Sequence, residues 1–391
     1  MNFEILNNEV QEFINSNLKS DITKLILKGS PFPSIKIQEI AEQILAKNKC
    51  KKKLPTWFNT SNIYYPNKLN IEQTSSEITA KYKSDLISGN NLIDITGGFG
   101  VDSYFFSQKV QNITHCEIND ELSKIVTHNY KKLNIHNITT FKGDGIQFLE
   151  NSTTKFDWVY ADPSRRNDEK GKVFLLEDCI PNIPENLTAL FDKTNNILLK
   201  ISPILDITSA INELVYVKEI HIIAIDNDVK ELLFLLEKNY AEPIKIETIN
   251  FTKNCTQQFA FYKTEKPSAT YSTPKKYLYE PNTAILKAGA FKHISEKLKI
   301  GKLHQHSHLY TSENLIDFPG RGFEIMHLIP YDKKRLKRLI PSKKANITTR
   351  NFPESVSQIR KKTGFKDGGN IYLFFTTDIN NSHIVLVCTK L

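Results

Sequence analysis

The stretch Asp94-Ile95-Thr96-Gly97-Gly98-Phe99-Gly100 decides the fold of this 391-residue chain. The apolar residues before it predict a β-strand. Its three glycines predict a turn in which missing side chains let backbone amides approach a ligand, and a helix is expected to follow. A dinucleotide-binding turn needs Gly-x-Gly-x-x-Gly, but Ser103 stands at the last of these positions. This departure argues against a nicotinamide dinucleotide.

The residues around this turn predict an α/β domain. Short apolar strands separated by helical segments are expected at residues 92–96, 113–117, 138–142, 158–161, 197–201 and 220–225. Because strands that alternate with helices pair through right-handed crossovers, this pattern predicts a parallel sheet. The loops after the strands then meet at one edge of the sheet, where open α/β folds bind ligands.

Acidic residues end the next two strands. Glu117 lies 23 residues after Asp94, where a Rossmann-like fold places the carboxylate that accepts from two ribose hydroxyls. Asp144 closes the third strand and is expected to accept from an adenine amine. The alternatives are a solvated acid at Glu117 and a simple Asp-Gly turn at Asp144. Because the glycine turn and both acids occur in order on successive strands, we favour an S-adenosylmethionine site.

The fourth strand ends in Asp162-Pro163-Ser164-Arg165-Arg166. Proline keeps the chain out of a helix here, so the Asp162 side chain can face the transferred group. With this loop, the chain resembles class I S-adenosylmethionine-dependent methyltransferases. The resemblance implies a Rossmann-like seven-stranded methyltransferase sheet and catalytic roles for Asp162, Pro163 and Arg165. It implies a cofactor site at Asp94, Gly97, Gly98, Gly100, Glu117, Asp144 and Asp162.

A closer resemblance covers nearly the whole chain. Motifs similar to those of a bacterial family of THUMP-like methyltransferase proteins are Ile71-Glu72-Gln73-Thr74-Ser75-Ser76-Glu77, Asp94 to Asp102, Asp162 to Arg166, Lys200-Ile201-Ser202-Pro203, Tyr279-Glu280-Pro281-Asn282, Leu309-Tyr310-Thr311-Ser312 and Phe318-Pro319-Gly320-Arg321. The organisation expected is an N-terminal helical segment at 1–70, a methyltransferase domain at 71–265, a ferredoxin-like segment at 275–320 and a THUMP-like domain at 321–391, the last two forming an α+β region. Since THUMP domains of related enzymes grip tRNA, the resemblance implies an RNA substrate, either tRNA or rRNA.

One departure leaves the acceptor atom open. Base-amine methyltransferases carry Asp/Asn-Pro-Pro and then an aromatic residue that stacks on the flipped base. Here Ser164 and Arg165 occupy those two positions. Arg165 has two possible roles, since a guanidinium can stack on a ring or bind phosphate.

The segment before the glycine turn predicts a helix. Thr74 and Glu77 have the spacing of a capping box, which predicts a helix from there to about residue 87. With Glu72, Gln73 and Ser76, this helix either folds over the cofactor as a lid or is simply capped and packed. Lys83 is expected on the surface or in packing. Lys200 has a possible acceptor-side role because it ends the fifth strand.

Basic residues are concentrated in the last third of the chain. From Thr273 to Leu391 there are 21 Lys or Arg against 9 Asp or Glu, within a total formal charge of +9. This density is suited to RNA, although a solvated lysine-rich surface is the alternative. The RNA-contact candidates are Lys333, Lys334, Arg335, Lys337, Arg338, Arg350, Arg360 and Lys361.

Several classes of protein are disfavoured. No apolar run is long enough for a membrane helix, and the first residues lack the pattern of a signal peptide. Five scattered cysteines without a Cys-x-x-Cys pair support neither disulfides nor a zinc site, and the alternating His304, His306 and His308 have no thiol or carboxylate nearby in sequence. We therefore expect a cytoplasmic protein without a membrane partner or a metal. The alternatives are a non-catalytic RNA-binding protein that retains the fold and a small-molecule methyltransferase.

Overall fold

The structure is a computed structural model that describes residues 1–165 and 175–391, except for the side chain of Arg165. The chain divides into two compact units. One comprises residues 1–218 with 233–241, and the other comprises residues 219–232 with 242–391. Within the described residues, no helix combines the length and apolar character that a membrane span requires.

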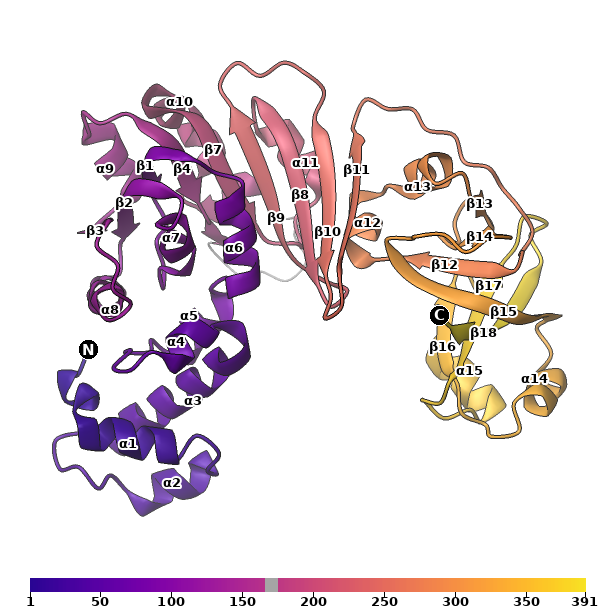
Figure 1. Cartoon of the computed structure of the whole chain (residues 1–391), viewed down its shortest axis with the longest axis horizontal. Helices are drawn as coiled ribbons and strands as arrows, with labels where there is room; N and C mark the ends of the chain where they lie inside the picture. Colours follow the sequence, from indigo (N-terminus) through magenta and orange to yellow (C-terminus); the bar gives the residue numbers. More distant parts are fainter. Residues whose placement is uncertain (166–174) are drawn as a thin grey trace. The chain divides into compact units, whose positions relative to one another are not determined.

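The N-terminal segment is helical, as expected (Figure 1). Its elements are η1 (Phe3–Leu6), α1 (Asn8–Ser16), α2 (Ile22–Lys28), α3 (Ile37–Lys53), α4 (Pro55–Asn59) and α5 (Lys68–Gln73). Ile40, Ile44 and Trp57 are buried in one core with Val126. Val126 belongs to α8 (Asp120–Lys132), a helix of the α/β domain. The N-terminal helices therefore share a hydrophobic core with that domain.

Helix α6 (Glu77–Asp85) begins later than the sequence suggested. The capping residue is Ser76, whose hydroxyl accepts from the Thr79 amide at 3.2 Å, so the assignment of Thr74 as the cap was wrong. Glu77 does not reach back to the cap, because its carboxylate accepts from the amide (2.6 Å) and hydroxyl (2.9 Å) of Thr56 on α4. A contact distant in sequence therefore displaced the local capping box.

A nine-stranded sheet follows. Its strands are β1 (Gly89–Asp94), β2 (Val110–Glu117), β3 (Ile138–Lys142), β4 (Phe156–Ala161), β7 (Thr194–Ile201), β8 (Val217–Ile225), β9 (Asp228–Glu237), β10 (Lys245–Phe251) and β11 (Thr256–Tyr262). Their order is β11-β10-β8-β9-β7-β4-β1-β2-β3. The expected α/β fold is confirmed, and β10 and β11 extend the sheet beyond the seven strands that the resemblance implied.

The four strands that carry the candidate residues are parallel neighbours. Asp94 pairs in register with His115 on β2 and Tyr160 on β4, and Glu117 pairs with Lys142 on β3. The loops after β1, β2, β3 and β4 therefore leave the sheet at the same edge. Helices α7 (Val101–Phe106), α8, α9 (Gly145–Asn151), α10 (Ile183–Lys193) and α11 (Ile207–Glu213) connect the strands. A small pair, β5 (Ser164–Arg165) and β6 (Cys179–Ile180), stands apart with η2 (Leu176–Asp178).

The C-terminal region is α+β, as expected. A seven-stranded sheet has the order β13-β14-β12-β15-β18-β17-β16. Its elements are β12 (Tyr277–Pro281), α12 (Thr283–Ala288), α13 (Phe291–Lys297), β13 (Gly301–Lys302), β14 (Tyr310–Ser312), β15 (Gly320–Pro330), α14 (Lys333–Leu339), β16 (Asn346–Arg350), α15 (Val356–Thr363), β17 (Ile371–Thr377) and β18 (His383–Lys390). Leu336 of α14 and Ile359 of α15 are buried with Leu373 and Val385, so both helices are anchored on β17 and β18.

Candidate active site

The glycine turn after β1 is packed on its inner side and open at its centre. A side chain at Gly97 would overlap the His115 ring, and one at Gly100 would overlap the Tyr130 hydroxyl. Gly98 differs: with a φ of 58°, its nearest neighbour to an added Cβ would be the Thr96 carbonyl oxygen at 3.8 Å. Two of these glycines are therefore explained by packing, and Gly98 lies where a ligand can approach the backbone.

Glu117 lies against this turn. Its Oε2 accepts from the Gly98 amide at 2.8 Å, and its Oε1 accepts from the Asn119 amide at 2.7 Å. Asn119 in turn caps α8 by accepting from the Leu122 amide. The carboxylate at the end of β2 is thus held beside the most open residue of the glycine turn.

Asp144 serves as the cap of α9. Its Oδ1 accepts from the amides of Ile146 (2.8 Å) and Gln147 (3.1 Å). Among the described residues, both hydrogen bonds of this exposed side chain use the same oxygen. The turn-type interpretation of Asp144 is therefore part of its role, and no hydrogen bond from a described residue uses Oδ2.

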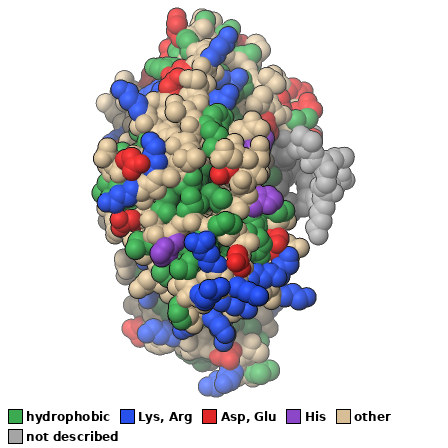
Figure 2. All heavy atoms as spheres, turned by 90° about the vertical axis from the view of Figure 1, so that its right-hand side faces the viewer, with side chains coloured by type: hydrophobic (Ala, Val, Ile, Leu, Met, Phe, Trp, Pro, Cys, Tyr) green, Lys and Arg blue, Asp and Glu red, His purple; other side chains and the backbone are tan. Residues whose placement is uncertain are grey.

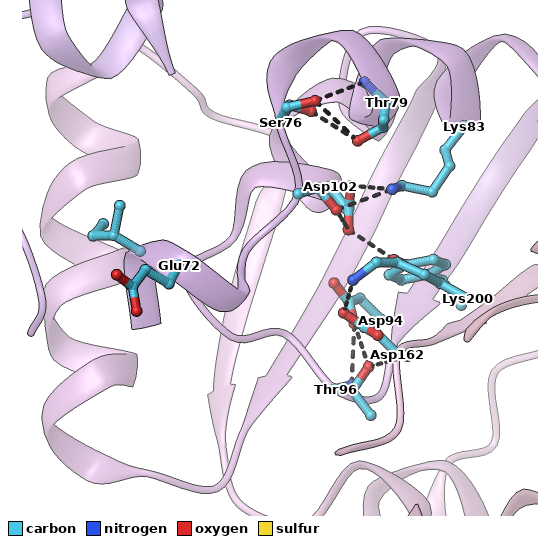
Figure 3. Close-up of polar contacts among 12 residues, drawn as sticks. Glu72, Ser76, Thr79, Lys83, Asp94, Thr96, Asp102, Asp162 and Lys200 are labelled. Carbon is cyan, nitrogen blue, oxygen red and sulfur yellow. Dashed lines mark hydrogen bonds and ion pairs between the residues drawn. The ribbon is translucent and has the colours of Figure 1, made fainter. Parts of the chain in front are cut away.

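Asp94 forms the buried base of the site. Its Oδ2 accepts from the Ser103 hydroxyl at 2.6 Å, and its Oδ1 accepts from the Thr96 amide at 3.0 Å. Burial raises the pKa of Asp94 to about 7 and lowers the pKa of the adjacent His115 to about 3, so this histidine is neutral. The Thr96 hydroxyl accepts from the Asp162 amide at 2.7 Å, which ties the glycine turn to the loop after β4 (Figure 3).

The raised pKa of Asp94 predicts a pH-dependent stability. The folded state holds this proton more tightly than the unfolded state, so the stabilisation is complete below about pH 4 and is lost as the pH rises towards 7. The full difference is on the order of 4 kcal/mol. Asp94→Asn is neutral throughout, so its melting temperature without cofactor should exceed that of the wild type by more at pH 8 than at pH 5. An equal difference at both pH values, with exposed Asp228→Asn as control, would contradict this assignment.

The acceptor side is marked by an ion pair. Lys200, at the end of β7, donates to Asp162 Oδ2, and the side chains are 12% and 34% exposed. Pro163 is half-buried, and Ser164 is exposed in β5. The structure therefore brings Lys200 together with Asp162, whereas the Arg165 side chain and Arg166 lie outside the described residues.

A second buried ion pair, between Lys83 and Asp102, was not predicted from the sequence. Lys83 is fully buried on α6, 3.1 Å from Asp102 Oδ1, and it donates to the Ser75 hydroxyl at 2.9 Å. Asp102 Oδ2 accepts from Ser75 (2.8 Å) and Tyr160 (2.7 Å). Burial alone would raise the pKa of Asp102, but the cations of Lys83 and Lys200 hold it below its usual range. This network joins α6, α7 and β4, and Figure 3 shows Lys83 and Asp102 next to Lys200 and Asp94.

Two of the proposed lid residues, Glu72 and Ser76, make contacts of capping and packing. Glu72 forms an ion pair with Lys49 of α3, and Ser76 bonds to Thr79 within α6. Glu77 binds Thr56, as described above. These contacts fit the capping interpretation of the segment.

The basic candidates of the C-terminal region divide into two groups. Arg350 donates to Glu280 Oε1 through Nε (3.1 Å) and Nη2 (2.9 Å), while Arg321 occupies Oε2. Arg360 binds Asp367 and the carbonyls of Phe365 and Ala345. In contrast, Lys333, Lys334, Arg335, Lys337 and Arg338 on α14, and Lys361 on α15, are exposed and form no ion pair with any described residue. Figure 2 shows Lys and Arg side chains gathered in the lower half of the face it presents.

The histidine series packs and hydrogen-bonds within the C-terminal region. His308 stacks on Phe291 at a centroid distance of 3.6 Å, and His304 bonds to Asn381 and Asn351. Within the part of the chain that the structure describes, no three His, Cys, Asp or Glu side chains form a group suited to a metal ion.

The fold and the strand-end loops define the class of protein: a class I methyltransferase fold followed by ferredoxin-like and THUMP-like regions. A family model for a ferredoxin-like domain matches residues 277–319, and one described as THUMP domain-like matches residues 320–390. The crystal structure of a "putative methyltransferase" from Porphyromonas gingivalis W83 is 32% identical, with a TM-score of 0.86 over 99% of this chain and 98% of that one. The chain belongs to the family of that protein, the bacterial THUMP-like methyltransferase proteins.

More distant matches cover less than half of the chain. TrmK of M. capricolum, in complex with S-adenosylhomocysteine, is 17% identical over 45% of this chain and 70% of that one, with a TM-score of 0.33. An rRNA methylase from Streptococcus thermophilus is 13% identical over 41% of this chain and 94% of that one, with a TM-score of 0.31. No curated protein sequence matches the chain.

Proposed function

We propose that this protein is an S-adenosylmethionine-dependent methyltransferase that acts on RNA. The observation that carries the proposal is the Glu117 carboxylate, held 2.8 Å from the Gly98 amide at the open centre of the glycine turn. A carboxylate at the end of the second strand, beside a glycine turn, suits a ribose with two free hydroxyls. The residues present therefore fit the nucleoside half of the cofactor.

Neighbouring residues complete this site. Asp144 caps α9 through Oδ1, and we assign its Oδ2 to an adenine amine. Asp94 accepts a hydrogen bond from the Thr96 amide, and the Thr96 hydroxyl accepts one from the Asp162 amide. These bonds connect the cofactor side of the site to its acceptor side. The bound cofactor supplies an electrophilic sulfonium methyl group. The protein contributes orientation and exclusion of water, with Asp162 holding the acceptor.

The exposed surface of α14 supports RNA as the substrate. Its five basic side chains lie on a helix whose Leu336 is buried, and none of them forms an ion pair with a described residue, although Glu354 interacts electrostatically with Lys333. Phosphates are recognised by such clusters. Arg350 and Arg360 are already bound within the protein, so we assign them to the scaffold of this surface, with Lys361 next to it.

Removal of charge from α14 should weaken RNA binding in a salt-dependent way. Lys333→Gln, Lys334→Gln and Lys337→Gln together retain helix-forming residues but remove three phosphate partners. We expect the slope of log K against log salt to fall by about 2 to 3, and the affinity near 0.1 M salt to fall at least about 10-fold. The matched control neutralises three exposed lysines of the N-terminal helices, Lys24, Lys28 and Lys51. Equal slopes for both triple variants would show that α14 is only a solvated surface.

A transfer assay tests the activity itself. The protein is incubated with methyl-labelled cofactor and total RNA from a strain that lacks it, and nucleosides are then analysed by mass spectrometry. A labelled nucleoside supports the proposal. RNA binding without cofactor uptake would instead identify a non-catalytic RNA-binding protein, and label only in small metabolites a small-molecule methyltransferase. An RNA substrate would also fit our expectation that the protein is cytoplasmic.

A further inference from the structure

The Asp94 carboxyl group bridges the two ends of the glycine turn. Its Oδ1 accepts from the Thr96 amide at 3.0 Å, and its Oδ2 lies 2.6 Å from the Ser103 hydroxyl oxygen. Thr96 directly precedes Gly97, and Ser103 lies on α7, which follows the turn. A ligand that approaches the open Gly98 therefore comes close to this carboxyl group, although Asp94 itself is only 1% exposed.

Among the described residues, no cation pairs with Asp94. The basic group within 4 Å is His115, whose Nδ1 is 3.9 Å away, and burial lowers the pKa of this histidine to about 3 and keeps it neutral. The charges that act on Asp94 are those of two further carboxylates, Asp102 and Asp162 (Figure 3). Because it is buried and faces like charges, the carboxyl group of Asp94 favours its protonated form.

The other titratable groups around Asp94 keep their charge near pH 7. Cys116 on β2 and Tyr130 on α8 are buried, which raises the pKa of both groups. Tyr160 on β4 pairs in register with Asp94 and donates its hydroxyl hydrogen to one of the two carboxylates. These carboxylates form ion pairs with lysines, Asp102 with Lys83 and Asp162 with Lys200. Asp94, with a pKa of about 7, is therefore the group of this cluster that gains or loses a proton near neutral pH.

The hydrogen bonds around Asp94 can be satisfied in both protonation states. The Ser103 hydroxyl oxygen lies 2.6 Å from Asp94 Oδ2 and 3.1 Å from His115 Nδ1. Since a hydroxyl is both donor and acceptor, Ser103 donates to the carboxylate when Asp94 is ionised and accepts from the acid when Asp94 is protonated. In the second case, its own hydrogen turns towards His115 Nδ1. Loss of the Asp94 proton therefore requires only that hydrogens change position.

The cofactor and the product of methyl transfer differ in charge. S-adenosylmethionine carries a sulfonium cation, whereas S-adenosylhomocysteine, the thioether left after transfer, does not. A cation bound at the glycine turn favours the ionised form of a buried carboxyl group, because opposite charges attract strongly where water is excluded. The neutral thioether has no such effect on Asp94.

We propose that Asp94 is the residue by which this site distinguishes the charged cofactor from the neutral product: it releases its proton to water when S-adenosylmethionine binds and takes one up again when the thioether replaces the cofactor. This inference rests on the proposed function. By linkage, cofactor binding becomes tighter as the pH rises through neutrality, whereas the contribution of Asp94 to product binding stays nearly constant. The exchange of product for cofactor is therefore favoured in the upper part of this pH range.

Titration calorimetry with each ligand tests the inference. Heats measured in buffers of different ionisation enthalpy give the number of protons released, and affinities are measured at pH 6 and 8. The proteins compared are the wild type, Asp94→Asn and the exposed control Asp228→Asn. Asparagine retains an oxygen for the Thr96 amide and a donor for Ser103, as the protonated acid does, but it cannot ionise. The α-amino group of both ligands titrates at about pH 8, and comparison with Asp94→Asn removes this contribution.

We expect the wild type and Asp228→Asn to release about half a proton more than Asp94→Asn when S-adenosylmethionine binds at pH 7, and no more than Asp94→Asn when the thioether binds. Between pH 6 and 8, wild-type affinity for the cofactor should rise about 5-fold more than that of Asp94→Asn. Equal proton release by wild type and Asp94→Asn, or equal excess release with both ligands, would overturn the inference and leave the proposed function intact. Absence of cofactor binding by the wild type would instead overturn the proposed function.

Infrared difference spectroscopy of the wild type gives a second measurement that does not depend on a variant. At pH 6 the protonated carboxyl group of Asp94 contributes a C=O stretching band. This band should disappear when S-adenosylmethionine binds and remain when the thioether binds. A carboxylic acid band that the cofactor leaves unchanged would overturn the inference.

Discussion

Glu117→Ala should lower the affinity for S-adenosylmethionine by at least about 100-fold, because two hydrogen bonds to a charged acceptor contribute about 1.5–3 kcal/mol each. The same substitution also removes the acceptor of the Gly98 amide, 2.8 Å away. Titration calorimetry measures the loss directly. The exposed Glu150→Ala, on α9, removes a carboxylate outside the site and should bind the cofactor normally.

Glu117→Gln separates the two roles of this residue. The amide oxygen of glutamine can still accept from Gly98, but the charge that favours the ribose hydroxyls is gone. We therefore expect the Gln variant to remain well below wild-type affinity. Full recovery in Gln would mean that Glu117 only holds the turn, and wild-type affinity in Ala would refute the site.

Lys83→Met should cause the largest loss of stability. It leaves the buried Asp102 carboxylate without its main cation, and breaking one partner of such a pair costs about 3–5 kcal/mol. For a unit of this size the melting temperature should fall by about 10 °C. The depressed pKa of Asp102 contributes stability near neutral pH that is lost as the pH falls, so the defect should shrink in acid.

The double variant Lys83→Met/Asp102→Asn tests the cause. Because both charges are removed, most of the lost stability should return, and the interaction energy between the two sites should be large. Thermal unfolding of the four proteins of this cycle gives that energy. Additive losses in the double variant would show that Lys83 acts through packing of its aliphatic chain instead.

The strand-end site was largely predictable because each of its parts is local. A glycine turn follows β1, an acid ends β2, an Asp-Gly pair follows β3 and a proline loop follows β4. Parallel strands bring such ends to one edge without further information. The local pattern could not show why glycine is needed at Gly97 and Gly100. Any side chain there would overlap His115 or Tyr130, which pack against the turn.

Strands β9, β10 and β11 were not predicted. The connection from β8 to β9 is only Asp226 and Asn227, both with positive φ, so the polar break between the two strands is a tight two-residue turn and not a longer loop. A short apolar run such as Leu232–Leu236 cannot be distinguished by periodicity from a buried helical segment. Only the pairing of these segments with neighbouring strands identifies β9, β10 and β11 as part of the sheet.

The sequence by itself determined two features: the order of the four strand-end loops that offer backbone amides and carboxylates to a ligand, and the position of the basic residues around α14. Only the tertiary structure decided which charges remain available. Lys83, expected on the surface or in packing, is buried on Asp102, and Arg350, expected at RNA, is bound to Glu280. The order of the loops depends on residues that are neighbours along the chain. An ion pair depends on a partner that tertiary packing brings from a distant part of the sequence. That partner decides whether a lysine or arginine stabilises the fold or stays available to bind a ligand.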